Sequence, residues 1–474
     1  MPRTIPLVVS IAFFLQLLDA TIMNTSLPQM SASFGVHLLD MGLGVTSYSL
    51  ALACTLPLAG WIATRFGAKL VLVVATGLFL VGSLGCAAAD RFSLFIAARV
   101  LQGIGGAAMN PVGRLIVLRT TPRSELLEAT NTITWPGLVA PLAGPLVGGF
   151  ITSQLGWRWN FILNIPIGLG CMWLTLKLVP RFEPERTSRL DLKGFVLASS
   201  AMGALLSGLG AVSDGDWGWA AWLSLGWGIV GGAMAWFHLR QVRAPVVDLA
   251  VLKIPSFRLA SLTAGMFVRV AVGAVPFLLP IMLQSVLGFG PLEAGAYLSV
   301  YFAGNFLGLF VATPVLRSFG FRKVMLANPV LVGASIAGLF LITPGFSKGL
   351  AWAMLFLGGV VRSVQFTGQS SLAYAEVPQT LDADASTLAS VLLQVSASLS
   401  VVFATAALSG VQRITGEGRL GLSTFRGTFL IMAALPLLTA WLFRRLPFDA
   451  GQALVGARRR RALPVDGAAE VAET

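Results

Sequence analysis

The sequence predicts an all-α polytopic membrane protein, and three observations support this prediction. The chain has 474 residues, of which 56% are hydrophobic and only 11% are charged. Its mean hydropathy is +0.81. Soluble domains carry about 25% charged residues, so this composition is that of an integral membrane protein. Apolar runs long enough to cross a hydrocarbon core of about 30 Å recur along the chain.

Fourteen such runs are expected to form membrane-spanning helices. Glycine and serine interrupt the last three, which makes these the weakest of the set. The expected spans, in chain order, are 6–28, 41–63, 70–89, 93–118, 129–152, 158–179, 192–211, 218–238, 259–284, 292–315, 323–343, 350–372, 386–409 and 424–443.

Lysine and arginine are distributed unevenly over the connecting segments. With the N-terminus inside, 24 of the 33 basic residues fall on the cytoplasmic side and six on the other side, and Arg99, Arg269 and Arg362 fall within spans. Cytoplasmic loops carry such an excess, so we expect an inner-membrane protein with both termini in the cytoplasm. The net charge of +13 then reflects topology and favours membrane lipids over nucleic acid as partner. The basic run 458–461 is expected either to lie at the lipid surface or simply to stop transfer of the chain across the membrane.

Asp19 lies deep in the otherwise apolar first span. An ionisable group at mid-bilayer depth costs about 2.5–3.5 kcal/mol on insertion scales, and it faces a bundle interior or a water path. Arg99 in the fourth span is its expected partner, because both residues lie roughly 10–13 Å from the outer face at 1.5 Å per residue. Burial favours the neutral carboxyl and a guanidinium favours the charged one, so Asp19 is a candidate proton site. A permanent structural ion pair is the alternative.

A short internal repeat divides the chain into two halves. Phe66-Gly67 lies between the second and third spans, and Phe319-Gly320 lies between the tenth and eleventh. Transporter folds are often built from such repeats, with the substrate path between them. We therefore expect a six-helix bundle over 1–180, an inserted helix pair over 181–255, a second six-helix bundle over 256–446 and a cytoplasmic tail over 447–474.

Four motifs in the first half resemble the fourteen-span drug:proton antiporter family of the major facilitator superfamily. They are Leu18 to Pro28 (L-D-x-T-I-x-N-x-x-L-P), Arg99 to Ala107 (R-x-x-Q-G-x-G-G-A), Gly144 to Gly149, and Trp157 to Gly168 (W-R-W-x-F-x-x-N-x-P-x-G). The resemblance implies a major facilitator fold with 6+2+6 helices. It also implies proton-coupled export of small organic compounds by alternating access, with no cofactor.

Two conformational motifs follow from this resemblance. The loop motif G-x-x-x-D-R-x-G-R-K is represented by Gly60, Thr64, Arg65, Gly67 and Lys69, so threonine replaces an aspartate that anchors a charge network in the family. Threonine can cap a helix but brings no charge. Arg65 and Lys69 are then expected to find acidic partners elsewhere.

The second motif is a glycine-rich stretch in the fifth span, formed by Gly144, Pro145, Gly148 and Gly149. Glycines four residues apart let helices approach closely, and proline removes a backbone hydrogen bond. In the family the stretch is associated with export. Plain helix packing is an equally good local explanation.

Polar residues within or near spans are candidates for lining the substrate cavity, although each alone is more often a link between helices. Arg269 and Arg362 favour anionic or zwitterionic substrates. The full set of candidates is Gln16, Asn24, Gln102, Asn110, Asn131, Arg269, Gln284, Asn305, Arg362, Gln365, Gln369 and Gln394.

Signals for enzymatic chemistry are weak. The G-x-G-x-x-G match at 226–231 lies inside an apolar span with no strand before it, and no ATP-binding P-loop pattern occurs. His37 and His238 are the two histidines, so neither a metal cluster nor a catalytic triad is expected. Two alternatives to drug export remain: a proton-linked importer of a metabolite or organic anion, and a membrane enzyme or lipid scramblase. The sequence makes no prediction of oligomeric state.

Overall fold

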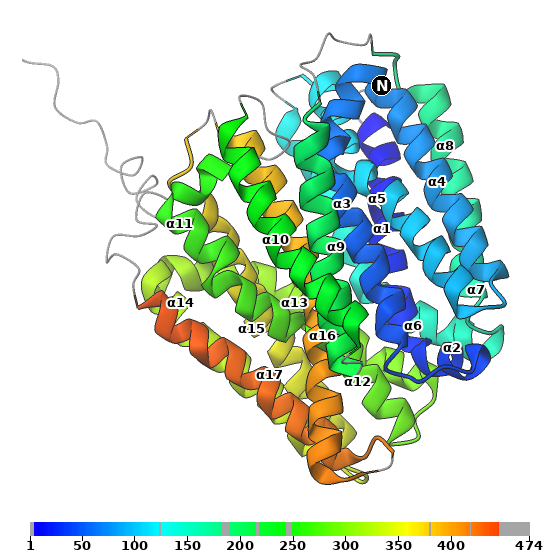
Figure 1. Cartoon of the computed structure of the whole chain (residues 1–474), viewed down its shortest axis with the longest axis vertical. Coiled ribbons are helices and arrows are strands. Elements are labelled where there is room, and N and C mark those ends of the chain that lie inside the picture. The colour runs from blue at the N-terminus through cyan, green and yellow to red at the C-terminus, as the bar shows by residue number, and fades with distance from the viewer. Residues whose placement is uncertain are drawn as a thin grey trace, which may run out of the picture.

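The structure is a computed structural model that describes residues 4–122, 125–182, 190–214, 218–242, 249–378, 381–417 and 419–444. Every regular element in these ranges is helical, and the long helices run side by side in a bundle (Figure 1). The expected tail 447–474 and its basic run 458–461 lie outside the described residues.

The first half comprises a broken first helix followed by six further helical elements. The first helix runs as α1 (Thr4–Ile22), η1 (Met23–Thr25) and α2 (Leu27–Phe34), and Pro28 lies at the start of α2. The remaining elements are α3 (Met41–Phe66), α4 (Ala68–Ala88), α5 (Phe92–Thr120), α6 (Leu126–Gln154), α7 (Trp159–Ile162) and α8 (Asn164–Leu178).

The predicted inserted pair, 181–255, contains α9 (Leu192–Asp214) and α10 (Trp219–Gln241). The second half begins with three short pieces, η2 (Leu249–Lys253), α11 (Pro255–Phe257) and the π-helical η3 (Arg258–Leu262). The long helices that follow are α12 (Ala264–Ser285), α13 (Pro291–Phe319), α14 (Phe321–Gly338) with η4 (Leu339–Leu341), α15 (Lys348–Tyr374), α16 (Asp382–Thr415) and α17 (Leu422–Phe443).

Thirteen helical segments of the described chain are long and apolar enough to cross a membrane. They make the protein a multi-pass membrane protein. The predicted span 129–152 lies within α6, which is not among the thirteen. The count of fourteen spans therefore stays a prediction.

The internal repeat is visible in the backbone. Gly67 and Gly320 have φ angles of +87° and +80°, a region that non-glycine residues rarely adopt. Each glycine immediately precedes a long helix, α4 after Gly67 and α14 after Gly320. A Cβ on Gly67 would also lie 2.8 Å from the carbonyl oxygen of Phe182. The two Phe-Gly sites thus form the same sharp connection in the two halves.

The hydrophobic core is continuous between the two halves at one end of the bundle and divided at the other end. At the end away from the N-terminus, one continuous cluster contains residues of both halves, such as Met23 and Phe95 with Phe277 and Phe425. Toward the N-terminal end the core divides into one cluster in the first half and another in the second. The halves are therefore joined at one end and separated at the other.

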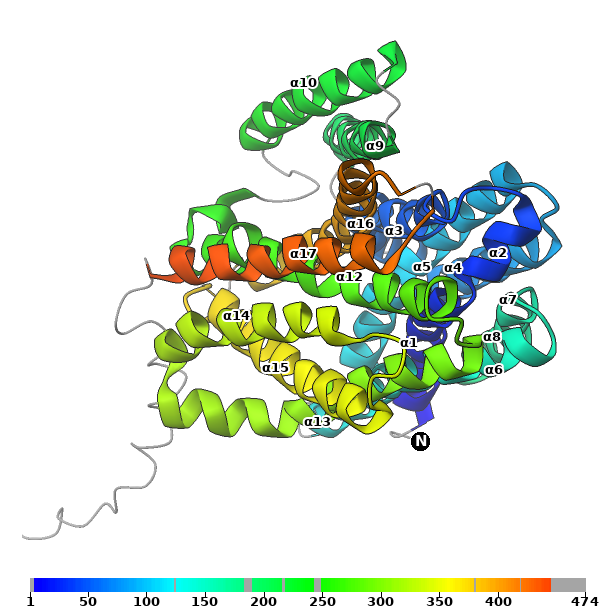
Figure 2. The same cartoon turned by 90° about the horizontal axis from the view of Figure 1, so that it is seen from below.

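The inserted pair lies at the edge of the molecule. α9 packs against α16 of the second half and α3 of the first, and α10 packs on the outer side of α9 (Figure 2). The outer face of α10 exposes large apolar residues, among them Trp222, Ile229 and Phe237. Such a face suits contact with lipid.

Candidate functional site

Asp19 is completely buried and accepts hydrogen bonds on both carboxylate oxygens. Arg99 Nη1 donates to Asp19 Oδ2 at 2.7 Å. Gln102 Nε2 and Asn164 Nδ2 donate to Asp19 Oδ1 at 2.9 and 2.7 Å. The three donors come from α5 and α8, while Asp19 itself lies on α1. All of them are N–H groups, a set that matches the charged form of the carboxyl group.

Arg99 is held as firmly as its partner, with only 1% of its surface exposed. Its Nε donates to the carbonyl oxygen of Gly44 at 3.1 Å, and its Nη1 also contacts Gln102 Oε1 at 2.8 Å. The guanidinium carbon lies 4.4 Å from the centre of the Tyr48 ring. A buried charge is tolerated when it is paired and hydrogen-bonded, and Arg99 has a carboxylate partner together with two further acceptors for its Nε and Nη1 groups.

A second layer of polar groups supports this pair. Ser83 Oγ on α4 accepts hydrogen bonds from Gln102 at 2.6 Å and from Asn164 at 3.1 Å. Gly82 permits the close contact, because a Cβ there would meet the backbone nitrogen of Gln102 at 2.7 Å. The predicted pair Asp19–Arg99 is thus found in contact, and the pair and its surroundings come from α1, α3, α4, α5 and α8.

The prediction from the sequence did not include three residues of this network, Tyr48, Ser83 and Asn164. Asn164 belongs to the recognised motif of the sixth span, and its position in that motif was the available signal. Tyr48 is one of four tyrosines in the chain, and it lies alone in the second span. Ser83 gave no signal, since a lone serine in an apolar helix most often bonds to its own backbone.

A cavity of about 430 Å³ lies between the halves, on the side of the N-terminal end. Gln16, Asn110 and Arg114 line it from the first half, and Ser390 and Gln394 line it from α16 of the second half. Gln16 Oε1 accepts a hydrogen bond from Asn110 Nδ2 at 2.7 Å. Leucine, isoleucine, phenylalanine, proline and glycine residues complete the wall, together with one more serine and one threonine. The cavity therefore offers an apolar surface with a few polar groups, the usual character of a small-molecule site.

The cavity and the buried pair are adjacent. Gln16 lines the cavity and lies one helical turn from Asp19 on α1. A Cβ placed on Gly106 would lie 3.1 Å from the Tyr48 hydroxyl and 3.6 Å from Gln16 Nε2, so these two groups meet over that glycine. Tyr48 in turn lies against Arg99. A chain of contacts therefore leads from the cavity through Gln16 and Tyr48 to the charge pair.

The other predicted cavity residues lie elsewhere in the structure. Gln102 is buried in the Asp19 network. Gln284 lies at the joined end, where it donates to the Thr25 carbonyl at 2.9 Å and accepts from Gln29 at 3.2 Å. Asn24 is buried in η1 at the same end.

The remaining candidates belong to the second half or to α6. Arg269 donates to the carbonyl oxygens of Ser261 and Ala260 at 3.0 and 3.2 Å, and Arg362 faces aromatic rings. Gln365 accepts from Asn328 at 2.9 Å. The others are Gln369, which is buried on α15, Asn305 on α13, and Asn131 on α6, whose side chain lies outside the described part of the chain.

The loop motif is held by backbone contacts. Thr64 Oγ1 donates to the carbonyls of Gly60 and Trp61 at 3.2 and 3.0 Å, so its hydroxyl bonds back into α3 and does not cap α4. Lys69 Nζ donates to the carbonyl oxygen of Leu176 at 2.8 Å, where an acidic partner was expected. Arg65 is exposed at the end of α3. With threonine in place of the aspartate, a backbone carbonyl is the nearest acceptor that α8 presents to Lys69.

The glycine-rich stretch of α6 lies where helices touch most closely. A Cβ on Gly144 or Gly148 would collide with Thr21 or Ile22 of α1, and one on Gly149 would collide with Pro291 of α13. The reverse contact also exists, because a Cβ on Gly295 would collide with the carbonyl of Pro145. The stretch therefore packs α6 simultaneously against its own half and against the other half, at the joined end.

Comparison with known proteins agrees with this architecture. Residues 9–401 match the family model described as Major Facilitator Superfamily. A relative from Salmonella paratyphi A and one from Salmonella typhimurium, both named "Putative multidrug resistance protein MdtD", are 35% identical over 466 residues. In both cases the alignment covers 96% of this chain and 97% of the relative.

A solved structure shares the fold at low sequence identity. The crystal structure of an auto-inhibited POT family peptide transporter has a TM-score of 0.67 at 17% identity, and the match covers 94% of this chain and 98% of the other. The family model covers most of the chain and the relatives cover 96% of it, with the four first-half motifs inside the matched region. The chain therefore belongs to the major facilitator superfamily.

Proposed function

We propose that the protein is a proton-coupled secondary active efflux transporter of small organic compounds, of the multidrug type. It acts by alternating access in the inner membrane, with both termini in the cytoplasm. The observation that carries this proposal is the sealed Asp19 carboxylate, held by three N–H donors one helical turn from a cavity between the two halves. The name of the Salmonella relatives supports the choice of substrate.

The hydrogen bonds around Asp19 suggest how a proton is coupled to conformation. Both carboxylate oxygens of Asp19 accept hydrogen bonds from N–H groups. A proton on either oxygen would therefore displace one of these donors or be repelled by its hydrogen. The conformation described here therefore favours the charged carboxylate. A proton that reaches Asp19 from the opposite side weakens its link to Arg99 and favours the other conformation. Return to this conformation expels the proton.

The geometry between the halves suggests how substrate moves. Under the proposed orientation the cavity opens toward the cytoplasm, and the joined end near Gly149 and Gln284 closes the outer side. We propose that the bundles 1–180 and 256–446 rock about this contact, while the pair 181–255 stays at the edge. Substrate enters the cavity from the cytoplasm and this rocking carries it to the outer side, where it leaves as a proton from that side binds Asp19 and travels inward on the return.

The variant Asp19→Asn tests the proposal. Asparagine keeps the size of the side chain but cannot exchange a proton, so proton-driven efflux from proteoliposomes should be abolished. Downhill exchange of substrate without a pH gradient should persist, because the cavity residues are unchanged. Asp40→Asn is the matched control, since Asp40 lies in an exposed turn of the same half, where it accepts from the backbone of His37.

Two results would contradict the proposal. Near-normal coupled efflux by Asp19→Asn would remove this carboxylate from the mechanism. A pH change of the opposite sign on addition of substrate would indicate a proton-linked importer. Measuring the internal pH of proteoliposomes during transport distinguishes these outcomes from a defect in folding, which gel filtration of the purified variant would detect.

A further inference from the structure

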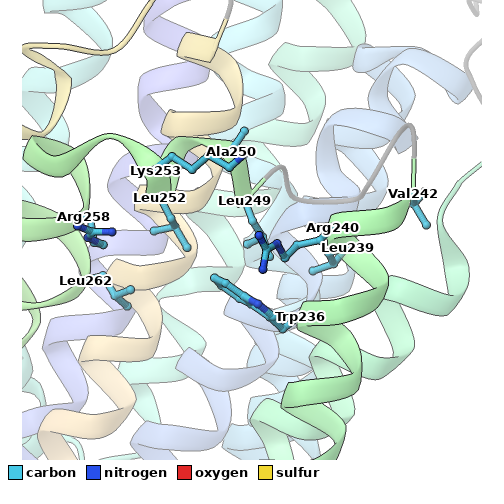
Figure 3. A pocket seen from close by; sticks show the side chains of 10 residues that line it. All are labelled: Trp236, Leu239, Arg240, Val242, Leu249, Ala250, Leu252, Lys253, Arg258 and Leu262. Atoms are coloured by element: carbon cyan, nitrogen blue, oxygen red, sulfur yellow. The ribbon is translucent and has the colours of Figure 1, made fainter.

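A second pocket lies far from the buried charge pair, between the end of α10 and the start of the second half. Its volume is about 440 Å³. Trp236, Leu239 and Arg240 reach into it from α10, and Leu252, Lys253, Arg258 and Leu262 line it from η2 and η3 (Figure 3). The pocket is thus bounded by the inserted pair on one side and the second bundle on the other.

The charges of this pocket all have the same sign. Arg240, Lys253 and Arg258 carry three positive charges, and none of the described residues that line the pocket is acidic. All three side chains are exposed. Arg240 also lies 5.7 Å above the ring of Trp236, which holds its guanidinium beside the apolar wall. Three cations around one hollow would repel one another, so the pocket is suited to an anion.

The other walls of the pocket are apolar. Leu239, Leu252 and Leu262 line the pocket beneath the cations, and the neighbouring face of α10 exposes Trp236 and Phe237. Tryptophan is enriched at the boundary between membrane and water. The pocket therefore combines a charged rim with an apolar floor, as a headgroup and its acyl chains require.

The position along the chain fits the same boundary. Arg240 follows the predicted span 218–238 and Arg258 precedes the predicted span 259–284, so both lie where helices leave the membrane on the side of the N-terminus. The excess of lysine and arginine marks this side as cytoplasmic. The inner leaflet carries anionic lipids, and basic pockets between membrane helices on that side bind their headgroups.

We propose that this pocket binds one anionic glycerophospholipid of the cytoplasmic leaflet. Its phosphate is held by Arg240, Lys253 and Arg258, and its acyl chains run along the leucines and Trp236. The lipid would fill the gap between the end of α10 and the second bundle. Since α10 otherwise packs mainly on α9, the lipid links α10 to the second bundle, beside the contact that α9 makes with α16.

Native mass spectrometry of the full-length protein, purified in detergent and titrated with phosphatidylglycerol, tests the proposal. We expect one phosphatidylglycerol per protein to be retained more tightly than the rest. Replacing Arg240, Lys253 and Arg258 together by glutamine should weaken this binding at least about tenfold, because each basic residue near the surface contributes to the attraction.

A matched control removes three other basic residues on the same end of the bundle. Lys177, Arg181 and Arg444 are exposed, and Lys177 lies 4.9 Å above the ring of Trp173 in a cation–tryptophan pair that does not line this pocket. Replacing these three by glutamine should leave the tight site unchanged. Titration with phosphatidylcholine tests whether the pocket binds any phospholipid regardless of its net charge. Titration with inorganic phosphate tests whether it binds a free anion.

A second measurement needs no variant. A phosphatidylglycerol with a photoreactive group near its headgroup should crosslink the wild-type protein within residues 236–242 or 249–262. Crosslinks confined to other segments would overturn the proposal. Equal retention of phosphatidylglycerol by the two triple variants, or equal binding of phosphatidylcholine, would also overturn it. Displacement of the lipid by millimolar inorganic phosphate would assign the pocket to a soluble anion instead.

Discussion

In the first half of the protein, the buried arginine faces a carboxylate, whereas the arginines within the second half face carbonyl oxygens and aromatic rings. Arg99 donates to Asp19 at 2.7 Å. Arg269 bonds to two backbone carbonyls. Arg362 lies 5.4–5.6 Å from the centres of three aromatic rings. Among the described residues, neither Arg269 nor Arg362 forms an ion pair.

This contrast indicates that the two halves, although built on the same repeat, hold buried groups of different chemistry. The first half holds a buried carboxylate together with three N–H donors that stabilise its charge. The second half contributes cationic and aromatic groups that do not change charge in the physiological range. Under the proposed mechanism, proton coupling depends on the first half, while the second half contributes to the cavity and to the contact at the joined end.

The largest expected effect comes from breaking the pair on one side only. Arg99→Gln leaves Asp19 buried without its counterion, and such a change costs about 3–5 kcal/mol of unfolding free energy. Arg362→Gln removes contacts with aromatic rings, worth about 0.5–2 kcal/mol. Reversible unfolding in mixed micelles would measure both. Equal losses for the two variants would contradict the contrast between the halves.

A smaller effect is expected for Asn164→Ala, which removes one hydrogen bond to the charged Asp19. A hydrogen bond to a charged group contributes about 1.5–3 kcal/mol, against about 0.5–1.5 kcal/mol for a neutral one. Asn328→Ala is the matched control in the second half, because Asn328 donates to the neutral oxygens of Val361 and Gln365 at 3.0 and 2.9 Å. The same unfolding assay compares them, and a greater loss for Asn328→Ala would refute the prediction.

The sequence was sufficient to predict the helical membrane fold and the partner of Asp19. Hydropathy predicts long helices directly, and equal depth in the membrane brings Asp19 and Arg99 to one level. The rotation of each helix about its axis was not accessible in this way. Gln102 and Gln16 are both polar and within spans, yet one bonds to Asp19 and the other lines the cavity. That distinction depends on packing between helices far apart in the chain.

The loop motif shows a different limit. The replacement of aspartate by threonine at position 64 was visible, and the loss of charge followed from it. The partner of Lys69 was not predictable, because a backbone carbonyl leaves no trace in the sequence, and here the carbonyl of Leu176 accepts from it. Similarly, Ser83 takes part in the Asp19 network only because Gly82 lets α4 approach α5.

The third prediction concerns the contact between the two halves. Gly149→Ala places a Cβ against the backbone of Pro291, and overpacking of this kind costs about 1–3 kcal/mol. The cost falls on the conformation in which α6 and α13 touch, so the joined end should open more often. Hydrogen–deuterium exchange at the ends of α6 and α13 should rise. Gly170→Ala on α8 is the control, since a Cβ there meets nothing within 4 Å, and equal exchange in both variants would argue against a gating role for this contact.

The smallest effect is expected at Glu417, a carboxylate of the second half that lies between α16 and α17, outside the predicted spans. Glu417 accepts hydrogen bonds from the hydroxyls of Ser423 and Thr424, and these lower the pKa of its carboxyl group. Since the folded-state pKa is the lower one, the stabilisation is present above the unfolded value of about 4.3 and disappears as the pH falls through the folded value.

Glu417→Gln should therefore lower the melting temperature slightly at pH 7 and leave it unchanged well below pH 4. Asp19 and Glu417 both accept hydrogen bonds from side chains, but Asp19 is fully buried and Glu417 lies at the surface, where water screens the charge. If burial is what makes the interactions of Asp19 important for stability, the pH-dependent loss of stability in Glu417→Gln must be much smaller than the loss of stability in Arg99→Gln. Differential scanning fluorimetry of wild type and Glu417→Gln across this pH range measures this loss of stability. A loss as large as that of Arg99→Gln would show that hydrogen bonding, without burial, accounts for the difference between the halves.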